Sequence, residues 1–280
     1  MLKNADMNCI ICDSRMEYYF SKEYDGFPGS PFLDGFIADY EKCINCGFVL
    51  SKTHREMEST LWERLNSSWH HYFEGSNTGQ VVNQPPYAEQ ALDLELLSRN
   101  SILNIESALD YAAGYGTLSK FLKKYFDKNL QIYDPYVQVS NDVNNYVSEP
   151  SKYSLVINSA MFEHVISRRA LDCVNFCVKD DGVLCIHTRI SEKIPNDPNW
   201  FYLTPHVHTA FHTNKSMEIL MRQWGYAASI YSPSAKCWFL IKNKHPMLKI
   251  IDQIIEAINS EVQAKHFYFK NGFVDFWKNF

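Results

Sequence analysis

The sequence lacks a long apolar run, an excess of positive charge, and an apolar stretch near its start. No segment has the length of apolar chain that a membrane-spanning helix needs, so we expect no membrane anchor. Lys and Arg number 27 against 32 Asp and Glu, and the resulting net charge of −5 gives no general attraction to nucleic acid or anionic lipid. The first residues lack the apolar core of a signal peptide, so we expect a cytoplasmic protein.

The chain nevertheless has eight cysteines, and in a reducing compartment thiols bind metals more readily than they form disulfides. Four of them form two Cys-x-x-Cys pairs, Cys9 with Cys12 and Cys43 with Cys46. Each pair can form a tight turn that points two sulfurs at one ion. The spacing predicts a structural zinc site with four thiolates, which leaves no open position for catalysis. Residues 13–42 are rich in Gly, Pro and aromatic side chains, and we expect the metal to hold them together.

A glycine turn organises the rest of the chain. A short apolar run ends at Asp110, Gly114 and Gly116 follow, and a helical pattern begins at Leu118. This order of strand, turn and helix is the first unit of a doubly wound α/β domain. Glycine lets the backbone bend sharply and lets a ligand approach it closely. A dinucleotide site would have Gly or Ala where this chain has Ser119, so the pattern fits an NAD site imperfectly.

A second apolar run, residues 130–133, ends at Asp134. A carboxylate at the end of the second strand can accept two hydrogen bonds from a ribose diol. S-adenosylmethionine (SAM) and NAD both carry such a diol. Asp134 therefore predicts nucleoside binding without choosing between the two.

A third segment, Leu155-Val-Ile-Asn-Ser-Ala-Met-Phe-Glu-His-Val165, separates these alternatives. It resembles the segment that follows a strand in class I SAM-dependent methyltransferases and often ends in Leu-Glu-His, and the turn at Asp110 to Gly116 resembles their first motif. The two cysteine pairs resemble the zinc-binding front domain of sugar C-methyltransferases. The resemblance implies a SAM site formed by Tyr87, Asp110, Ala112, Gly114, Gly116, Asp134, Pro135, Asn158 and Phe162.

Two departures from that family are visible. Only a short segment separates Asp134 from the strand predicted at residue 153, so the usual third strand and its adenine-contacting acid are not evident. Asp142 is the candidate substitute. The chain is also too short for the large C-terminal domain of the sugar enzymes.

Three histidines follow the predicted fifth strand at even spacing: His206, His208 and His212. On an extended segment they would face one side, so they suggest a metal site. No carboxylate accompanies them, however, and the segment resembles the stretch before the last helix of these methyltransferases, which implies a role in the substrate pocket. We expect His164, His206 and His208 to border the pocket and to act as a base or hold the substrate.

The resulting prediction is an α/β protein with a doubly wound, mostly parallel sheet. It comprises a zinc-binding module (1–52), a helical lid or linker (53–106), a SAM-binding methyltransferase domain (107–245) and a C-terminal helical extension (246–280). The substrate would be a small molecule, such as a sugar nucleotide or another metabolite, with no nucleic-acid or membrane partner. The aromatic C-terminal segment must dock on the chain or on a second copy. The alternatives are an NAD-dependent enzyme and a non-catalytic zinc-containing interaction protein.

Overall fold

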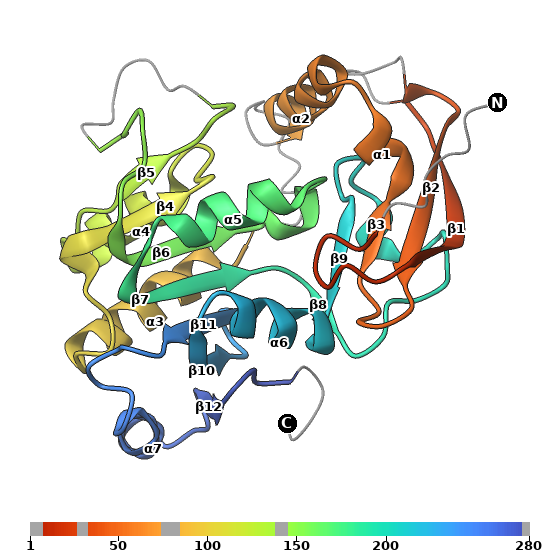
Figure 1. Ribbon diagram of the computed structural model, residues 1–280. Coiled ribbons are helices and arrows are strands. Elements are labelled where there is room, and N and C mark those ends of the chain that lie inside the picture. The colour runs from red at the N-terminus through yellow and green to blue at the C-terminus, as the bar shows by residue number, and fades with distance from the viewer. Residues whose placement is uncertain (1–7, 27–32, 74–84, 138–144, 276–280) are drawn as a thin grey trace.

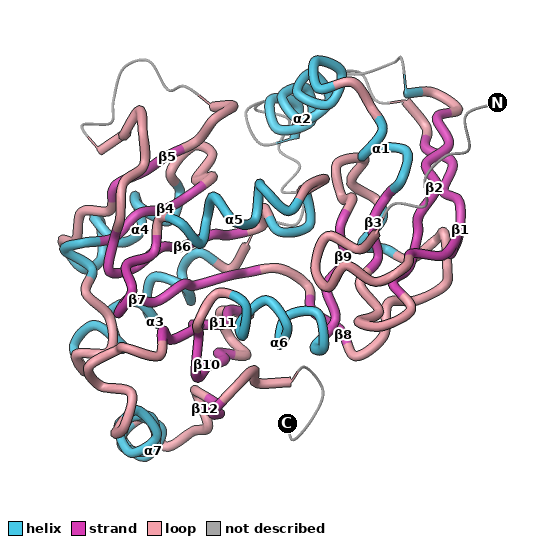
Figure 2. The backbone as a smooth tube through the Cα atoms, viewed as in Figure 1, coloured by secondary structure: helices cyan, strands magenta, loops and turns pink. Residues whose placement is uncertain are grey.

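Two sheets organise the computed structural model, which describes residues 8–26, 33–73, 85–137 and 145–275 (Figure 1). A seven-stranded sheet forms one side of the molecule and a five-stranded sheet forms the other (Figure 2). No helix among the described residues is long and apolar enough to cross a bilayer.

The seven-stranded sheet is mixed and not mostly parallel, which corrects the prediction. Its strands pair in parallel from β7 through β6 and β4 to β5, and in antiparallel fashion from β7 through β11 and β10 to β12. The antiparallel half arises because β10 and β11 form a hairpin and the C-terminal segment returns as an edge strand. In spatial order the strands are β12 (Tyr268–Asn271), β10 (Tyr226–Ser232), β11 (Cys237–Lys242), β7 (Val178–His187), β6 (Tyr153–Ser159), β4 (Ala108–Tyr111) and β5 (Gln131–Tyr133).

Helices cover both faces of this sheet, as the doubly wound prediction requires. Alternate residues of β6 show this, because Leu155 and Ile157 pack into one apolar cluster and Val156 into another. The first cluster includes side chains of α3 (Tyr87–Arg99), α4 (Thr117–Phe126) and α7 (Ile251–Glu261). The second includes side chains of α5 (Arg168–Phe176) and α6 (Asn214–Gln223).

The five-stranded sheet contains most of the N-terminal segment. The described part of residues 13–42 does not depend on a metal alone, because β1 and β2 pair along their whole length. The segment after β7 completes the sheet, since β9 pairs with β3 and β8 with β9. The division of the chain at residue 52 stays a prediction, and residues 190–191 and 210–213 share this front sheet. Its order is β1 (Met16–Tyr24), β2 (Phe36–Cys43), β3 (Val49–Ser51), β9 (Ala210–Thr213) and β8 (Ile190–Ser191).

The predicted helical lid or linker begins with two helices, α1 (Lys52–Glu56) and α2 (Ser59–Phe73). Trp62, Leu65 and Trp69 of α2 are buried in a cluster with Val207. At the other end of the chain, Phe267 and Phe273 are buried against the seven-stranded sheet, so this part of the aromatic segment docks on its own chain. The aromatic residues at 276, 277 and 280 lie outside the described residues.

Candidate functional site

A cavity of about 890 Å³ lies at the carboxyl ends of the parallel strands. The carboxyl ends of β6 and β7 and the segments that follow β4, β5, β6 and β7 all line it, through residues 112–115, 134, 136–137, 159–161 and 187–190. Parallel strands present their carboxyl ends at one edge of a sheet, and ligands of open α/β sheets bind there. The cavity is therefore the candidate site.

The glycine turn forms one wall of this cavity. Ala112, Gly114 and Gly116 all have positive φ, at 61°, 54° and 68°. A Cβ on Gly116 would lie 2.8 Å from Cδ1 of Ile132, so the position requires glycine for space as well as for conformation. The amide of Ala112 donates to the carbonyl oxygen of Tyr133 at 2.8 Å, which ties the turn to β5.

Asp134 both lines the cavity and holds the turn in place. Its Oδ2 accepts from the amide of Gly114, and its Oδ1 accepts from the amides of Tyr136 and Val137, each at 2.8 Å. An ionised carboxylate has about four acceptor positions, so three bonds leave capacity for a ligand. The predicted role at a ribose is thus joined by a role in shaping the loop.

Asp110 lies beneath the turn and does not line the cavity. Its side chain is buried, and its Oδ1 has no hydrogen-bond partner among the described residues. Burial, and secondarily the charge of Asp134, raise the pKa of Asp110 to about 8. Its carboxyl group is therefore largely protonated at neutral pH, which disfavours the direct ionic contact with a cofactor that its position at the strand end suggested.

Some of the other predicted cofactor residues line the cavity, and the rest lie behind its wall. Tyr87 and Ala112 line the cavity together with Gly114. Asn158 is buried and donates through Nδ2 to the carbonyl oxygen of Tyr111 at 2.9 Å, which joins the ends of β6 and β4. The residues that do not line it are Gly116, Pro135, Asn158 and Phe162. Asp142 lies outside the described residues.

Glu163, His164 and His208 converge on the other half of the cavity. Glu163 and His164 belong to a short 3-10 helix, η3 (Phe162–His164), that follows β6. His208 follows another, η4 (Phe201–Leu203). The amide of Thr209 donates to the carbonyl oxygen of Glu163 at 2.7 Å, which holds the two segments together. One ligand atom of each side chain lies within 4.8 Å of the others.

Tyr202 supports two members of this cluster. Its hydroxyl donates to Oε1 of Glu163 at 2.8 Å, and its carbonyl oxygen lies 2.6 Å from Nδ1 of His208. A carbonyl only accepts, so Nδ1 of His208 carries the proton and Nε2 has a free lone pair. Burial raises the pKa of Glu163, lowers that of His208 to about 4 and lowers that of His164 well below its usual value. Both imidazoles are therefore neutral at pH 7.

The evenly spaced histidines do not share one face, which corrects the prediction of an extended segment. Residues 206 and 207 form a turn, so the rings diverge. His206 does not line the cavity, and its ring packs on Tyr24 and Trp69 with centroids 4.6 and 5.3 Å away. His212 is buried between two phenylalanine rings. Only His208 reaches the cavity, where its ring centroid lies 5.0 Å from that of His164.

Several lining residues had no firm assignment from the sequence. Apolar residues at helical spacing in α2 indicate a buried face. The spacing cannot show that Trp62, Trp69 and His70 border a cavity. Glu163 was visible in its motif, and only the fold shows that Tyr202 bonds to it. The remaining aromatic or cationic side chains of the wall include Tyr115, Arg189, Phe201, Tyr231, Trp238 and Tyr268.

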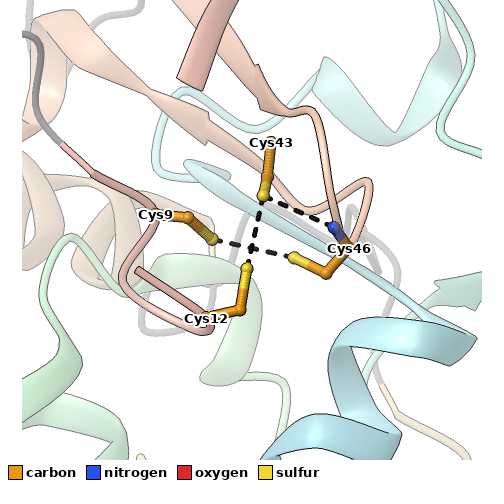
Figure 3. Close-up of side chains that lie close together, drawn as sticks. All are labelled: Cys9, Cys12, Cys43 and Cys46. Carbon is orange, nitrogen blue, oxygen red and sulfur yellow. Dashed lines mark hydrogen bonds between the residues drawn. The ribbon is translucent and has the colours of Figure 1, made fainter. Parts of the chain in front are cut away.

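The four N-terminal cysteines converge on a second point, away from the cavity (Figure 3). The Sγ atoms of Cys9 and Cys46 are 3.7 Å apart, and those of Cys12 and Cys43 are 3.4 Å apart. These separations are far longer than a disulfide bond. Each pair forms a turn, in which the amide of Ile11 points to Sγ of Cys9 and that of Cys46 points to Sγ of Cys43.

Comparisons with known proteins identify one matching family. A family model described as "Methyltransferase domain" matches residues 86–229, a little over half of the chain. No protein of curated function matches the sequence. Among solved structures, the plantazolicin methyltransferase BpumL in complex with S-adenosylhomocysteine (SAH) and a substrate analogue is 11% identical, with a TM-score of 0.42 over 66% of this chain and 97% of that one. Magnesium protoporphyrin IX methyltransferase from Synechocystis PCC 6803 with bound SAH is 14% identical, with a TM-score of 0.37 over 56% and 84% of the two chains.

Proposed function

The chain belongs to the methyltransferase-domain family, and on that premise we propose that it transfers a methyl group from SAM to a small molecule bound in the cavity. The observation that carries this proposal is the position of the glycine turn and Asp134 on the same cavity as Glu163, His164 and His208. One half of the cavity suits a nucleoside, and the other half suits a substrate.

The residues present fit the cofactor. Ala112 and Gly114 line the cavity with small side chains or none, so a ligand can approach the backbone of the turn there. Asp134 would accept hydrogen bonds from the ribose, as the sequence predicted. Ala112 and Gly114 would lie along the methionine part, and Tyr87, at the start of α3, would cover it.

SAM would supply an electrophilic methyl group attached to a positively charged sulfur. The chain would contribute mainly by placing the acceptor atom in line with that methyl group and by excluding water. An oxygen or nitrogen acceptor loses a proton when it is methylated. Glu163, His164 and His208 would take up that proton or hold the acceptor atom, and we propose no role in the reaction for His206.

The walls of the substrate half are largely aromatic. Trp62 and Trp69 approach from α2, and Tyr231 and Trp238 approach from the hairpin of β10 and β11. Flat apolar surfaces of this kind bind rings by stacking. They favour a substrate with a planar ring, and a sugar nucleotide, which the cysteine pairs suggested, offers such a ring in its base.

We also propose that the four cysteines bind one structural zinc ion. Four thiolates around zinc at about 2.3 Å stand about 3.8 Å apart in a tetrahedron. The two measured separations between sulfur atoms, 3.7 and 3.4 Å, fit that arrangement closely. All four ligands come from the chain, so this zinc would have no open position for a substrate.

Calorimetric titration of the full chain with SAM, SAH and NAD tests the proposed activity. We expect SAM and SAH to bind and NAD not to bind. Asp134→Asn should weaken SAM binding at least tenfold, because bonds to a charged acceptor contribute roughly 1.5–3 kcal/mol each. Asp127→Asn is the matched control, since Asp127 is exposed at the end of α4 and does not line the cavity. Tight NAD binding would reverse the assignment, and failure to bind any nucleoside would favour a non-catalytic role.

A further inference from the structure

The structure assigns a second metal site, and we propose that Glu163, His164 and His208 bind a Zn²⁺ ion whose remaining position takes an oxygen or nitrogen donor of the substrate. This site is separate from the four cysteines. Metal binding does not depend on the proposed function, whereas the substrate's place on the ion does.

The ligand set is the first argument. Two imidazole nitrogens and one carboxylate oxygen are a common protein set for zinc that keeps a position open for water or substrate. The three ligand atoms lie within 4.8 Å of one another. Ligands around a tetrahedral zinc at about 2.05 Å stand about 3.3 Å apart, so small side-chain rotations bring these atoms onto one ion.

The second argument is an unsatisfied oxygen. Glu163 is 2% exposed, and its Oε2 has no hydrogen-bond partner among the described residues. A buried carboxylate oxygen without a partner is unfavourable unless a cation or a proton meets it. Glu163 also lines the cavity, so a small rotation of its carboxylate would turn that oxygen toward a cation bound there.

The third argument is the support around the ligands. Metal-binding histidines usually donate their other N–H to a carbonyl or carboxylate, and metal-binding carboxylates are themselves hydrogen-bonded. Tyr202 supplies both contacts, since its carbonyl oxygen accepts from His208 and its hydroxyl donates to Glu163. The ring of His70 stacks on that of His164 at 5.5 Å between centroids, which fixes the third ligand.

The arrangement is also suited to a substrate. The three side chains line a cavity of about 890 Å³, so an ion that they bind would border space in which a substrate can lie. One carboxylate and two neutral imidazoles leave a net positive charge on a divalent ion. That charge would attract a substrate oxygen or nitrogen and favour its deprotonated form.

Cobalt substitution of the full-length protein tests the proposal. Cobalt bound by thiolates absorbs in the near ultraviolet through charge transfer, whereas cobalt bound by nitrogen and oxygen shows only visible bands. The two sites can therefore be titrated separately, with zinc competition giving the affinities. We expect the wild-type chain to bind one ion of each kind.

Glu163→Gln and His208→Gln should each weaken the nitrogen–oxygen site at least tenfold and leave the thiolate site unchanged. Tyr202→Phe keeps all three ligands and should weaken metal binding about 10- to 100-fold, as loss of a supporting contact does. His206→Gln is the matched control, because His206 is a neighbouring histidine outside the cavity, and both ions should remain.

Circular dichroism and SAM titration of each variant keep the test independent of folding and of the proposed activity. A chain that folds and binds SAM but takes up only thiolate-bound cobalt overturns the metal site and leaves the methyltransferase proposal standing. Cobalt affinity unchanged in both Glu163→Gln and His208→Gln also overturns it. A metal-binding chain that does not bind SAM overturns the methyltransferase proposal instead.

Discussion

The four-cysteine cluster and the Glu163–His164–His208 cluster show two ways in which one chain gathers metal-ligating side chains. The sulfurs meet at the edge of the front sheet, and their turns are closed by backbone amides. The second cluster borders a large cavity and keeps one buried carboxylate oxygen without a partner in the described chain. A closed set of ligands suits stability, and an open set suits chemistry.

The surroundings of the two clusters are less distinct than their ligands. In the front region the hydroxyl of Thr213 donates to the carbonyl oxygen of Cys46, but both ring nitrogens of the buried His212 have no partner among the described residues. Near the cavity, Glu163 also buries an oxygen without such a partner. Only the position of Glu163 on the cavity wall links its oxygen to a bound ligand.

The largest effect is expected from breaking the closed cluster with Cys43→Ser. Binding of structural zinc is folding free energy, on the order of 10–16 kcal/mol in small zinc domains, and three ligands hold the ion far less well than four. We expect loss of one zinc ion per chain and a fall in melting temperature large enough to unfold the front sheet.

Metal analysis and thermal melting measure this outcome, and Cys173→Ser is its control. Cys173 is exposed on α5 and takes no part in the cluster, so its substitution should change neither quantity. Full zinc occupancy in Cys43→Ser would show that the four cysteines do not form the proposed zinc site.

The sequence predicted the four-cysteine cluster better than the cluster of Glu163, His164 and His208. The cysteine pairs could be recognised because each pair is local, with its two ligands three residues apart. The glycine turn and the strand ending in Asp134 are local too. The cluster at Glu163 could not be predicted from spacing, because His208 joins it only through the fold. Even spacing grouped His206, His208 and His212, and a turn separates them in space.

The sheet topology was predicted in part for a similar reason. Alternation and length identify β6 and β7 as buried strands, and the glycine turn orients β4. Nothing local shows that residues 210–213 leave the main sheet and pair with residues 49–50. Long-range pairing of that kind depends on which apolar faces meet, and the front sheet was therefore not foreseen.

Substitutions at two glycines allow a direct comparison of backbone strain and crowding in the two regions. Gly116 belongs to the glycine turn and Gly35 to the front region. Gly116 and Gly35 have nearly equal φ, 68° and 70°, but a Cβ would meet Ile132 at 2.8 Å only at Gly116. Gly35→Ala should lower the unfolding free energy by about 1 kcal/mol through backbone strain alone. Gly116→Ala should lower it by roughly 2–4 kcal/mol, because overpacking adds to the strain.

Denaturant titration gives the two unfolding free energies, and SAM calorimetry gives the functional effect. We expect Gly116→Ala to weaken SAM binding about tenfold and Gly35→Ala to leave it unchanged. Adding Ile132→Val, which removes Cδ1, should recover part of the stability of Gly116→Ala. Equal losses at the two glycines would show that crowding contributes nothing at the turn.

Asp110 makes the free energy of unfolding depend on pH. Its pKa is raised to about 8 by burial and by Asp134, so between its unfolded pKa and pH 8 the folded state holds a proton that the unfolded state releases. The unfolding free energy therefore falls as pH rises through this range, by no more than about 1.4 kcal/mol per pH unit.

Asp110→Asn should remove this contribution, because an amide does not ionise. Between pH 6 and 7.5 we expect the wild-type chain to lose up to about 2 kcal/mol relative to the variant. Urea unfolding of both proteins at several pH values measures the difference. Parallel pH profiles would place the pKa of Asp110 near its ordinary value and would restore it as an ionic partner for the cofactor.

The smallest effect is expected at His206, which lies between the two regions. Its Nε2 lies 2.5 Å from the carbonyl oxygen of Asp25, and its ring packs on Tyr24 and Trp69. These contacts belong to packing between the front sheet and α2. His206→Gln keeps a donor but loses the ring, so we expect a loss of roughly 1 kcal/mol in stability. SAM affinity and metal content should stay within twofold of the wild type. If His206→Gln lowered the metal content as much as His208→Gln does, His206 would have to reach the cavity. Both histidines would then be candidate ligands of the ion.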